Sequence, residues 1–270
     1  MPTTRTLPTT VPTTRTLATT VPTTRTPATL GDVATRLLAH YGEEPWWWPV
    51  LLPDLPRADE LLLGAVLCQQ SRWERVEQAL LRLDAAGLST WEALAAADPA
   101  VLQPLLVGVA YPPTRARLLP RLAAAVLAAG GLPTVLAAPD ARARLLALPQ
   151  VGPETADTLL AFAAGQHVPV VDAYLRRVLG RLGLVDPAAS YAAVREDLAG
   201  QDTGGVSWEV LHALVVEHGI HHCLTRTPLC RGSGHPKRDY AEPRKCVEHC
   251  RTCTACPLLE VCPTGASGQG

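Results

Sequence analysis

Apolar residues recur every three to four positions along most of the chain from Gly31 to about Gly219, and Pro or Gly residues interrupt this pattern at short intervals. Such spacing puts apolar side chains on one face of a helix, so it predicts a succession of short amphipathic helices. The expected helices span residues 31–41, 57–68, 72–86, 90–96, 98–105, 113–129, 132–137, 140–147, 153–164, 173–182, 189–199 and 206–218. No alternation typical of β-strands stands out, and the expected fold class is therefore all-α.

The two ends of the chain depart from this pattern. Residues 2–30 repeat a ten-residue unit rich in Thr and Pro, which cannot form a core, so residues 1–30 are expected to be a disordered tail. The arginines of this tail could touch a phosphate backbone weakly, or the repeat could have no function. After Gly219 a cysteine-rich segment runs to the end, and we expect it to need a metal to fold.

Composition and charge limit the class of protein. With 270 residues, 47% hydrophobic and 18% charged, the chain can bury the core of one large or two small domains. No apolar run reaches the roughly 18 residues that span a membrane, and no hydrophobic signal region begins the chain, which favours a cytoplasmic protein without a membrane partner. The net charge of −1 gives no general attraction to polyanions. Contacts to nucleic acid would then come from backbone amides or local basic clusters, such as the seven Lys and Arg against three Asp and Glu between residues 223 and 251.

The stretch "LPQVGPETAD" places a Pro and Gly turn between two helical patterns. Pro149 cannot extend a helix, Gly152 can adopt positive φ, and the helical period resumes after Pro153. The free amides of Val151 and Gly152 at the start of the second helix suit an anion such as a phosphate. The alternative is an ordinary helical hairpin.

A second candidate lies in "VPVVDAYLRRV", where Asp172 directly precedes a predicted helix. Its plain role is that of an N-cap. Its functional role would be that of a carboxylate at the mouth of a cleft, able to orient water or to face a developing positive charge.

Together with "HGIHHC" and the cysteines that follow it, these motifs resemble the helix-hairpin-helix DNA glycosylases of the endonuclease III superfamily over roughly residues 31–262. The resemblance implies a two-lobed fold, with a six-helix barrel at about residues 55–165, a second lobe from residues 31–54 and 166–222, and a [4Fe–4S] cluster loop with a basic insertion in residues 223–270. It implies a monomer that binds double-stranded DNA across the cleft and flips a damaged base into a pocket beside Asp172. The hairpin residues expected at the DNA are Pro149, Gln150, Val151, Gly152 and Thr155.

One departure from the family pattern concerns the mechanism. Members that also cleave the strand carry a nucleophilic lysine where this chain has Glu154, and the only lysines here are Lys237 and Lys245. No core amine is therefore available to form a Schiff base. We therefore expect a monofunctional glycosylase in which Asp172 assists water and an abasic site is left, while Glu154 complements the helix dipole.

The motif "GAVLCQQSRW" corresponds in this family to a loop that enters DNA. Gln70 stands where a residue fills the gap left by the flipped base, and Gln69 is its neighbour; both could instead be surface amides. Trp73 and Trp47 are the expected base-pocket residues. The stretch "EPWWWP", this loop with its tryptophan, and the glutamate at the lysine position make the chain most similar to the subgroup that includes 3-methyladenine glycosylases, which implies an alkylated purine as substrate. The tryptophans of "EPWWWP" could instead fill the core.

The cysteines leave alternatives open. The family spacing Cys-x6-Cys-x2-Cys-x5-Cys is supplied by Cys246, Cys253, Cys256 and Cys262. The family's first ligand, however, follows the last helix in an HGxxxC context, which favours Cys223 with Cys253, Cys256 and Cys262, and leaves Cys230 and Cys246 as rivals. Three remaining cysteines, Cys230, Cys246 and Cys250, could form a zinc site with His235 or His249.

Two other functions remain open. One is an endonuclease III-type glycosylase and lyase acting on oxidised pyrimidines, which would need another amine. The other is a catalytically weak DNA-binding paralogue, which Gln150 in place of the family's first hairpin glycine favours and Asp172 in its expected place argues against.

Overall fold

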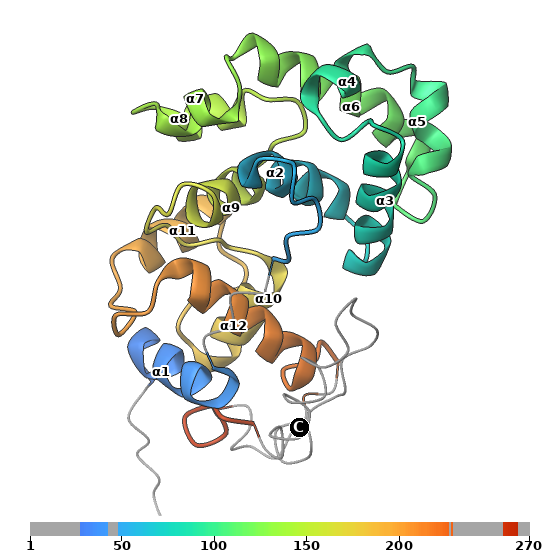
Figure 1. The fold of residues 1–270 in the computed structure, drawn as a ribbon. Helices are drawn as coiled ribbons and strands as arrows, with labels where there is room; N and C mark the ends of the chain where they lie inside the picture. The colour runs from blue at the N-terminus through green and yellow to red at the C-terminus, as the bar shows by residue number, and fades with distance from the viewer. Residues whose placement is uncertain (1–27, 43–47, 227, 229–255, 264–270) are drawn as a thin grey trace, which may run out of the picture.

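The computed structural model describes residues 28–42, 48–226, 228 and 256–263. These residues form twelve α-helices and no β-strand (Figure 1), which confirms the all-α fold class. The helices are α1 (Leu30–Tyr41), α2 (Arg57–Cys68), α3 (Trp73–Ala85), α4 (Trp91–Ala96), α5 (Pro99–Leu105), α6 (Pro112–Ala128), α7 (Leu132–Ala137), α8 (Ala141–Leu146), α9 (Pro153–Phe162), α10 (Ala173–Leu182), α11 (Tyr191–Ala199) and α12 (Trp208–His221). Each expected helix is present, with ends that differ by at most three residues.

Short polar side chains start six of these helices. The cap residue accepts a hydrogen bond from a backbone N–H of the first turn and so satisfies a donor that has no partner inside the helix. The capping residues are Thr29 of α1, Thr90 of α4, Asp98 of α5, Asp172 of α10, Ser190 of α11 and Ser207 of α12. Local sequence therefore fixes where much of this succession of helices begins.

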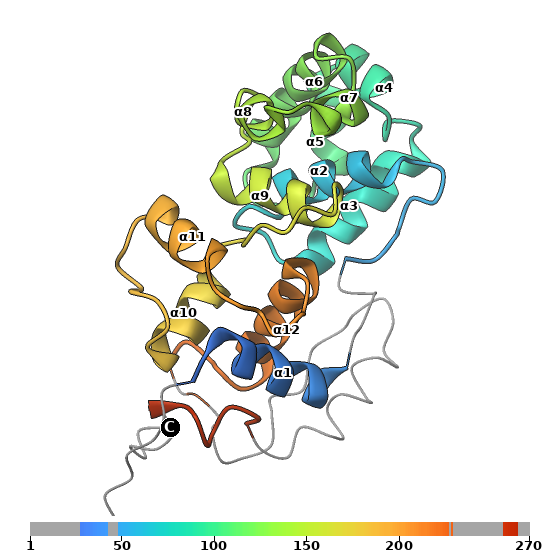
Figure 2. The same ribbon diagram turned by 90° about the vertical axis from the view of Figure 1, so that its left-hand side faces the viewer.

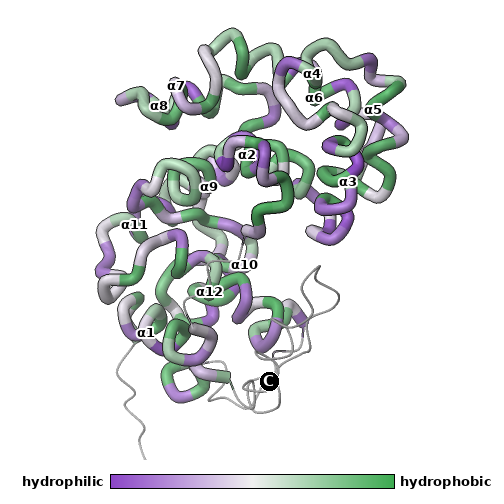
Figure 3. Tube along the Cα trace, in the orientation of Figure 1, coloured by the Kyte–Doolittle hydropathy of each residue, from purple (hydrophilic) through white to green (hydrophobic). Residues whose placement is uncertain are grey.

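The helices enclose two separate hydrophobic cores. One core gathers buried side chains from Leu52 to Leu160, and the other joins α1 to buried side chains from Val171 to Cys223 and to Leu258. Figure 2 shows the corresponding two groups, α2 to α8 in one and α1 with α10 to α12 in the other, with α9 between them. Hydrophobic residues recur along the helices of both groups (Figure 3). Helix α9 contributes to the first core and contacts α12, so it lies where the two lobes meet.

Helix α12 continues through Gly219, although the sequence pattern predicts its end near residue 218. A Cβ atom at this glycine would lie 2.5 Å from Cδ1 of Tyr174, so only glycine permits α10 and α12 to approach this closely. Gly219 therefore allows α10 and α12 to pack closely and does not end α12.

The described C-terminal residues pack against the second lobe. Leu258 is buried in the second core, and Glu260 forms an ion pair with Arg36 of α1 at 3.3 Å. None of the helices in the described residues is long and apolar enough to cross a membrane.

Candidate active site

The hairpin between α8 and α9 contains a tight backbone turn over residues 148–151. Val151 N–H donates to the Leu148 carbonyl at 3.2 Å, which closes a turn whose third residue, Gln150, has a φ of +64°. This corrects the expectation for Gly152, which has a φ of −91°. A turn with Pro149 second requires positive φ at the third residue when the second is extended, and Gln150 occupies that position.

Gly152 is the N-cap residue of α9, and no described side chain caps this helix. Added Cβ atoms at Gly152 would meet nothing within 4 Å among the described atoms, so space lies in front of this end of the helix. The side chains of Val151 and Thr155 are buried. Any contact that they make to DNA would therefore use their backbone amides, which the helix dipole makes attractive to a phosphate.

The loop between α2 and α3 lies against this hairpin. Gln69 Nε2 donates to the Gln150 carbonyl at 3.1 Å, and Gln150 Nε2 donates to Gln69 Oε1 at 3.3 Å. The buried Arg115 of α6 holds Gln69 through its carbonyl at 3.1 Å and its side-chain oxygen at 3.2 Å. Gln69 is thus fixed by the protein, whereas its neighbour Gln70 is exposed and has a φ of +62°.

Two carboxyl groups interact electrostatically near the hairpin. Asp172 caps α10 by accepting a hydrogen bond from Leu175 N–H at 2.7 Å, which confirms the plain N-cap prediction. Solvent reaches the Glu154 side chain, yet protein surrounds it closely enough that partial dehydration, together with the charge of Asp172, raises its pKa to about 7. The nearby cation of Arg176 opposes this shift. Glu154 can therefore gain or lose a proton at neutral pH.

An aromatic cluster connects the first lobe to His212 of α12. The rings of Trp48 and Trp73 have centroids 5.1 Å apart, Phe162 lies 6.2 Å from Trp48, and His212 lies 5.7 Å from Phe162. Burial lowers the pKa of His212, and the charge of Asp172 opposes that effect. The imidazole is therefore neutral and close enough to Asp172 to sense its charge. Trp47 lies outside the described residues.

Sequence reasoning missed two residues of this region. Tyr111 is 63% exposed with a φ of +56°, and the adjacent Ala110 N–H donates to the Ser71 hydroxyl, so Tyr111 lies beside the Gln70 loop. An exposed aromatic residue before "PPTR" gives no periodic signal. Asp157 of α9 is fully buried, and only the positions of its arginine partners reveal its role.

Three of the four cysteines that the structure describes meet at one cavity, and the fourth, Cys68, lies at the end of α2. Cys223, Cys256 and Cys262 line it together with Arg181 of α10 and His218 of α12. Arg181 Nη1 lies 3.1 Å from Cys223 Sγ, and His218 Nε2 lies 3.7 Å from Cys256 Sγ. Within the described ranges no three His, Cys, Asp or Glu side chains are close enough to hold a single ion. Three thiols around one cavity with adjacent N–H donors fit a cluster bound through thiolates.

The remaining cysteines of the sequence predictions lie outside the described residues. They are the fourth favoured ligand Cys253, the rivals Cys230 and Cys246, and Cys250, together with both histidines of the suggested zinc site. Nothing in the described part of the chain supports that zinc site.

Residues 63–201 match the family described as HhH-GPD superfamily base excision DNA repair protein. A provisionally named DNA repair glycosylase of Methanocaldococcus jannaschii is 30% identical over 200 residues, which cover 72% of this chain and 88% of that protein. Endonuclease III of Bacillus subtilis is 28% identical over 127 residues, which cover 47% of each protein. The match thus spans about half of that relative.

Solved structures share the fold. The enzyme in a non-covalent endonuclease III–DNA complex superposes with a TM-score of 0.68 at 22% identity, covering 87% of this chain and 94% of that one. The H. pylori 3-methyladenine DNA glycosylase bound to 1,N6-ethenoadenine gives a TM-score of 0.57 at 22% identity, covering 71% of this chain and 97% of that one.

Proposed function

Because this chain belongs to the HhH-GPD superfamily of base excision DNA repair proteins, we propose that it removes a damaged base from double-stranded DNA by hydrolysis and leaves an intact abasic site. The observation that carries this proposal is the pairing of Glu154 with Asp172, in a chain whose only lysines are residues 237 and 245. A carboxyl pair can activate water and stabilise a cation, whereas it cannot form the iminium that strand cleavage needs.

Asp172 supplies the negative charge in this mechanism. As the bond from C1′ of the sugar to the base breaks, its electrons leave with the base and positive charge develops on the sugar. The Asp172 carboxylate, fixed by its bond to Leu175 N–H, stabilises that charge. Water then adds to C1′ and loses a proton, and Glu154 can accept this proton because its pKa is close to neutrality.

The proposed substrate class is an alkylated purine. Such a base carries positive charge, stacks well on electron-rich rings and needs little activation as a leaving group. The ring cluster of Trp48, Trp73 and Phe162 supports this choice, since its neighbour His212 senses the charge of Asp172. The fold shared with a protein named as a 3-methyladenine DNA glycosylase supports it as well. Trp47 would add a further ring.

DNA would lie along the surface formed by the hairpin and the Gln70 loop. The amides from Gln150 to Thr155 would hold a phosphate, Gln70 would enter the duplex where the base leaves, and the exposed ring of Tyr111 would contact the same region. We propose that the protein acts there as a monomer in the cytoplasm.

A [4Fe–4S] cluster would be held by Cys223, Cys256 and Cys262 at the described cavity, with Cys253 as fourth ligand. When bound, such a cluster supplies a covalent link between the C-terminal segment and the second lobe. Arg181 and His218 would orient the thiolates from α10 and α12.

A panel of duplex oligonucleotides, each carrying one lesion, tests the proposed function. Release of an alkylated purine, with strand breaks only after alkali, is the expected result, and Asp172→Asn should reduce release to a small residual rate while DNA binding persists. Strand breaks without alkali at an oxidised pyrimidine would favour the lyase alternative. Binding without base release from any lesion would favour the DNA-binding paralogue.

A further inference from the structure

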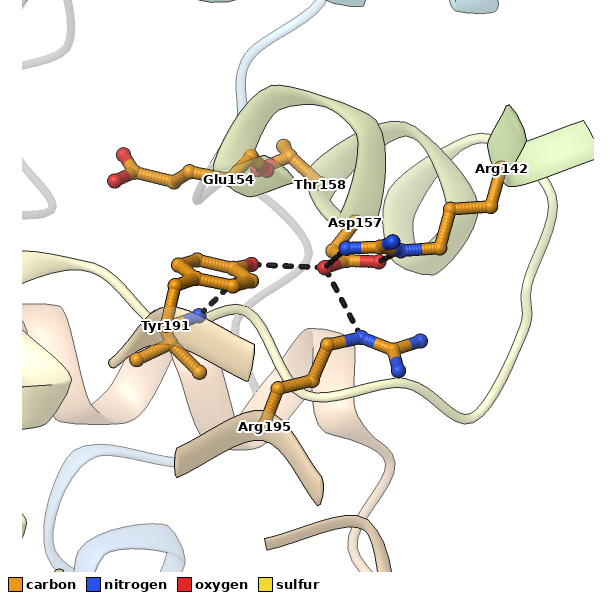
Figure 4. Close-up of polar contacts among 7 residues, drawn as sticks. Arg142, Glu154, Asp157, Thr158, Tyr191 and Arg195 are labelled. Atoms are coloured by element: carbon orange, nitrogen blue, oxygen red, sulfur yellow. Dashed lines mark hydrogen bonds and ion pairs between the residues drawn. The ribbon is translucent and has the colours of Figure 1, made fainter. Parts of the chain in front are cut away.

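The buried carboxylate of Asp157 collects three partners (Figure 4). Arg142 Nε lies 2.8 Å from Oδ1 and Arg142 Nη2 lies 3.1 Å from Oδ2, a two-pronged contact. Arg195 Nε lies 3.0 Å from Oδ2, and the Tyr191 hydroxyl donates to the same oxygen at 2.9 Å. The Asp157 side chain is 0% exposed, so all of its negative charge is satisfied by these groups.

Asp157 and its partners come from three helices. Arg142 belongs to α8 and Asp157 to α9, the two helices of the hairpin, while Tyr191 and Arg195 belong to α11 of the second lobe. The two arginines are partly exposed, at 36% and 26%, so solvent screens their surplus positive charge. One carboxylate thus joins both arms of the hairpin to the opposite lobe.

Tyr191 extends this link to the segment that carries Asp172. Its hydroxyl oxygen lies 3.5 Å from Val171 N–H, a long contact that is oriented for donation to the tyrosine. Burial and the Asp157 carboxylate raise the pKa of Tyr191, so its hydroxyl keeps its proton at physiological pH and continues to donate. Val171 directly precedes Asp172, so the link ends one residue from the carboxylate.

The covalent connection between these parts is irregular. Helix α9 ends at Phe162 and α10 begins at Ala173, and residues 163–171 between them contain no helix. A phosphate held at the start of α9 and a sugar placed against Asp172 must nevertheless keep a fixed separation, because both belong to the same stretch of DNA.

We propose that Asp157 and Tyr191 are positioning residues that set this separation between the phosphate-binding hairpin and Asp172. The inference rests on the proposed function, since it assigns to Asp172 the charge that faces the sugar. Asp157 and Tyr191 act through Asp172 and touch no substrate. Asp157 holds the hairpin to α11, and Tyr191 relays that position to Val171.

The test compares Tyr191→Phe, which removes only the hydroxyl, with Ser190→Ala, which removes the α11 cap at the neighbouring residue without touching Asp157. Single-turnover base release, affinity for a duplex with a stable abasic-site analogue, and melting temperature are measured for each. We expect Tyr191→Phe to slow release about tenfold or more, with affinity unchanged within about twofold. Ser190→Ala should lower the melting temperature and leave the release rate at the level of the unmodified protein. Equal loss of rate in both variants would overturn the proposal.

A double variant separates positioning from an independent effect. If Tyr191 acts through Asp172, adding Tyr191→Phe to Asp172→Asn should cause no further loss of the residual rate. Losses that multiply would overturn the proposal. Full activity of Asp172→Asn alone would instead refute the assignment of Asp172 under the proposed function.

Hydrogen exchange gives a readout that does not depend on base release. Exchange of the peptide covering residues 163–172 should be faster in Tyr191→Phe than in the unmodified protein and unchanged in Ser190→Ala, because only the first loses the acceptor of Val171 N–H. If no lesion is processed, the proposed function fails while this measurement still decides the link. Unchanged exchange in Tyr191→Phe would refute it.

Discussion

Glu154→Gln should be more stable than the unmodified protein, and this gain in unfolding free energy should grow as pH rises. The carboxyl has a pKa of about 7 in the folded chain and an ordinary value of 4.5, so the folded state binds its proton more tightly than the unfolded state. Stability from this group is complete below pH 4.5 and is lost as pH rises towards 7. Glutamine is neutral throughout and avoids that loss.

The magnitude follows from the two pKa values. A gap between 4.5 and about 7 corresponds to about 3 kcal/mol if no solvent screened the group. The Glu154 side chain is exposed, so screening reduces the expected gain to about 1–2 kcal/mol at pH 8. At pH 4 the glutamate is mostly protonated in both states, and the pH-dependent gain should be small.

Urea denaturation of both proteins at several pH values between 4 and 8 measures this difference. Comparing the two proteins at each pH cancels contributions from other titrating groups that they share. The expected result is a difference in unfolding free energy that grows between pH 4.5 and 7 and then stays level. A difference that is the same at every pH would refute the argument.

Asp172 provides an internal control. Its charge raises the pKa of Glu154, whereas dehydration makes the larger contribution. In an Asp172→Asn background the gain from Glu154→Gln should therefore shrink but persist. Complete loss of the gain would show that charge repulsion alone raises the pKa of Glu154.

Three further outcomes are expected. Purified protein should carry about four irons per chain, and Cys262→Ser should lose them; folded unmodified protein without iron would exclude the cluster. Borohydride should trap no protein–DNA adduct with the unmodified chain, whereas Glu154→Lys should introduce trapping at the family's lysine position; efficient trapping of the unmodified chain would contradict hydrolysis. Gly219→Ala should lower the unfolding free energy by about 1–3 kcal/mol through its clash with Tyr174, while Gly200→Ala, whose Cβ meets only a carbonyl at 3.9 Å, should change little; equal effects would refute the packing argument.

The order and extent of the helices could be predicted because their determinants are local. Ser190, Ser207 and Asp172 each stand at a cap position before an amphipathic pattern, and the structure uses each of them as the cap. The juxtaposition of the hairpin with the Gln70 loop followed only from the family resemblance, since residues 69 and 150 are far apart in sequence.

The tertiary contacts could not be predicted from local sequence patterns. Gly219 looked like a helix terminus, but its role depends on Tyr174 of another helix. The sequence pattern does not single out Asp157, which is buried because Arg142 and Arg195 approach from two other helices. Neither property is encoded within a few residues of the site, so no periodicity could reveal it.

Near-neutral net charge bears on how the hairpin would hold DNA. With 24 Lys and Arg against 25 Asp and Glu, the chain has no general long-range attraction to a polyanion. At the start of α9 it also has Glu154 where lyase members of the family have a cation. Backbone amides can still bind a phosphate there, and a phosphate near Glu154 would raise the pKa of that carboxyl above about 7. Repulsion between ionised Glu154 and that phosphate should therefore weaken DNA binding as pH rises through about 7, while the ionised fraction of Glu154 stays available to accept the proton from water.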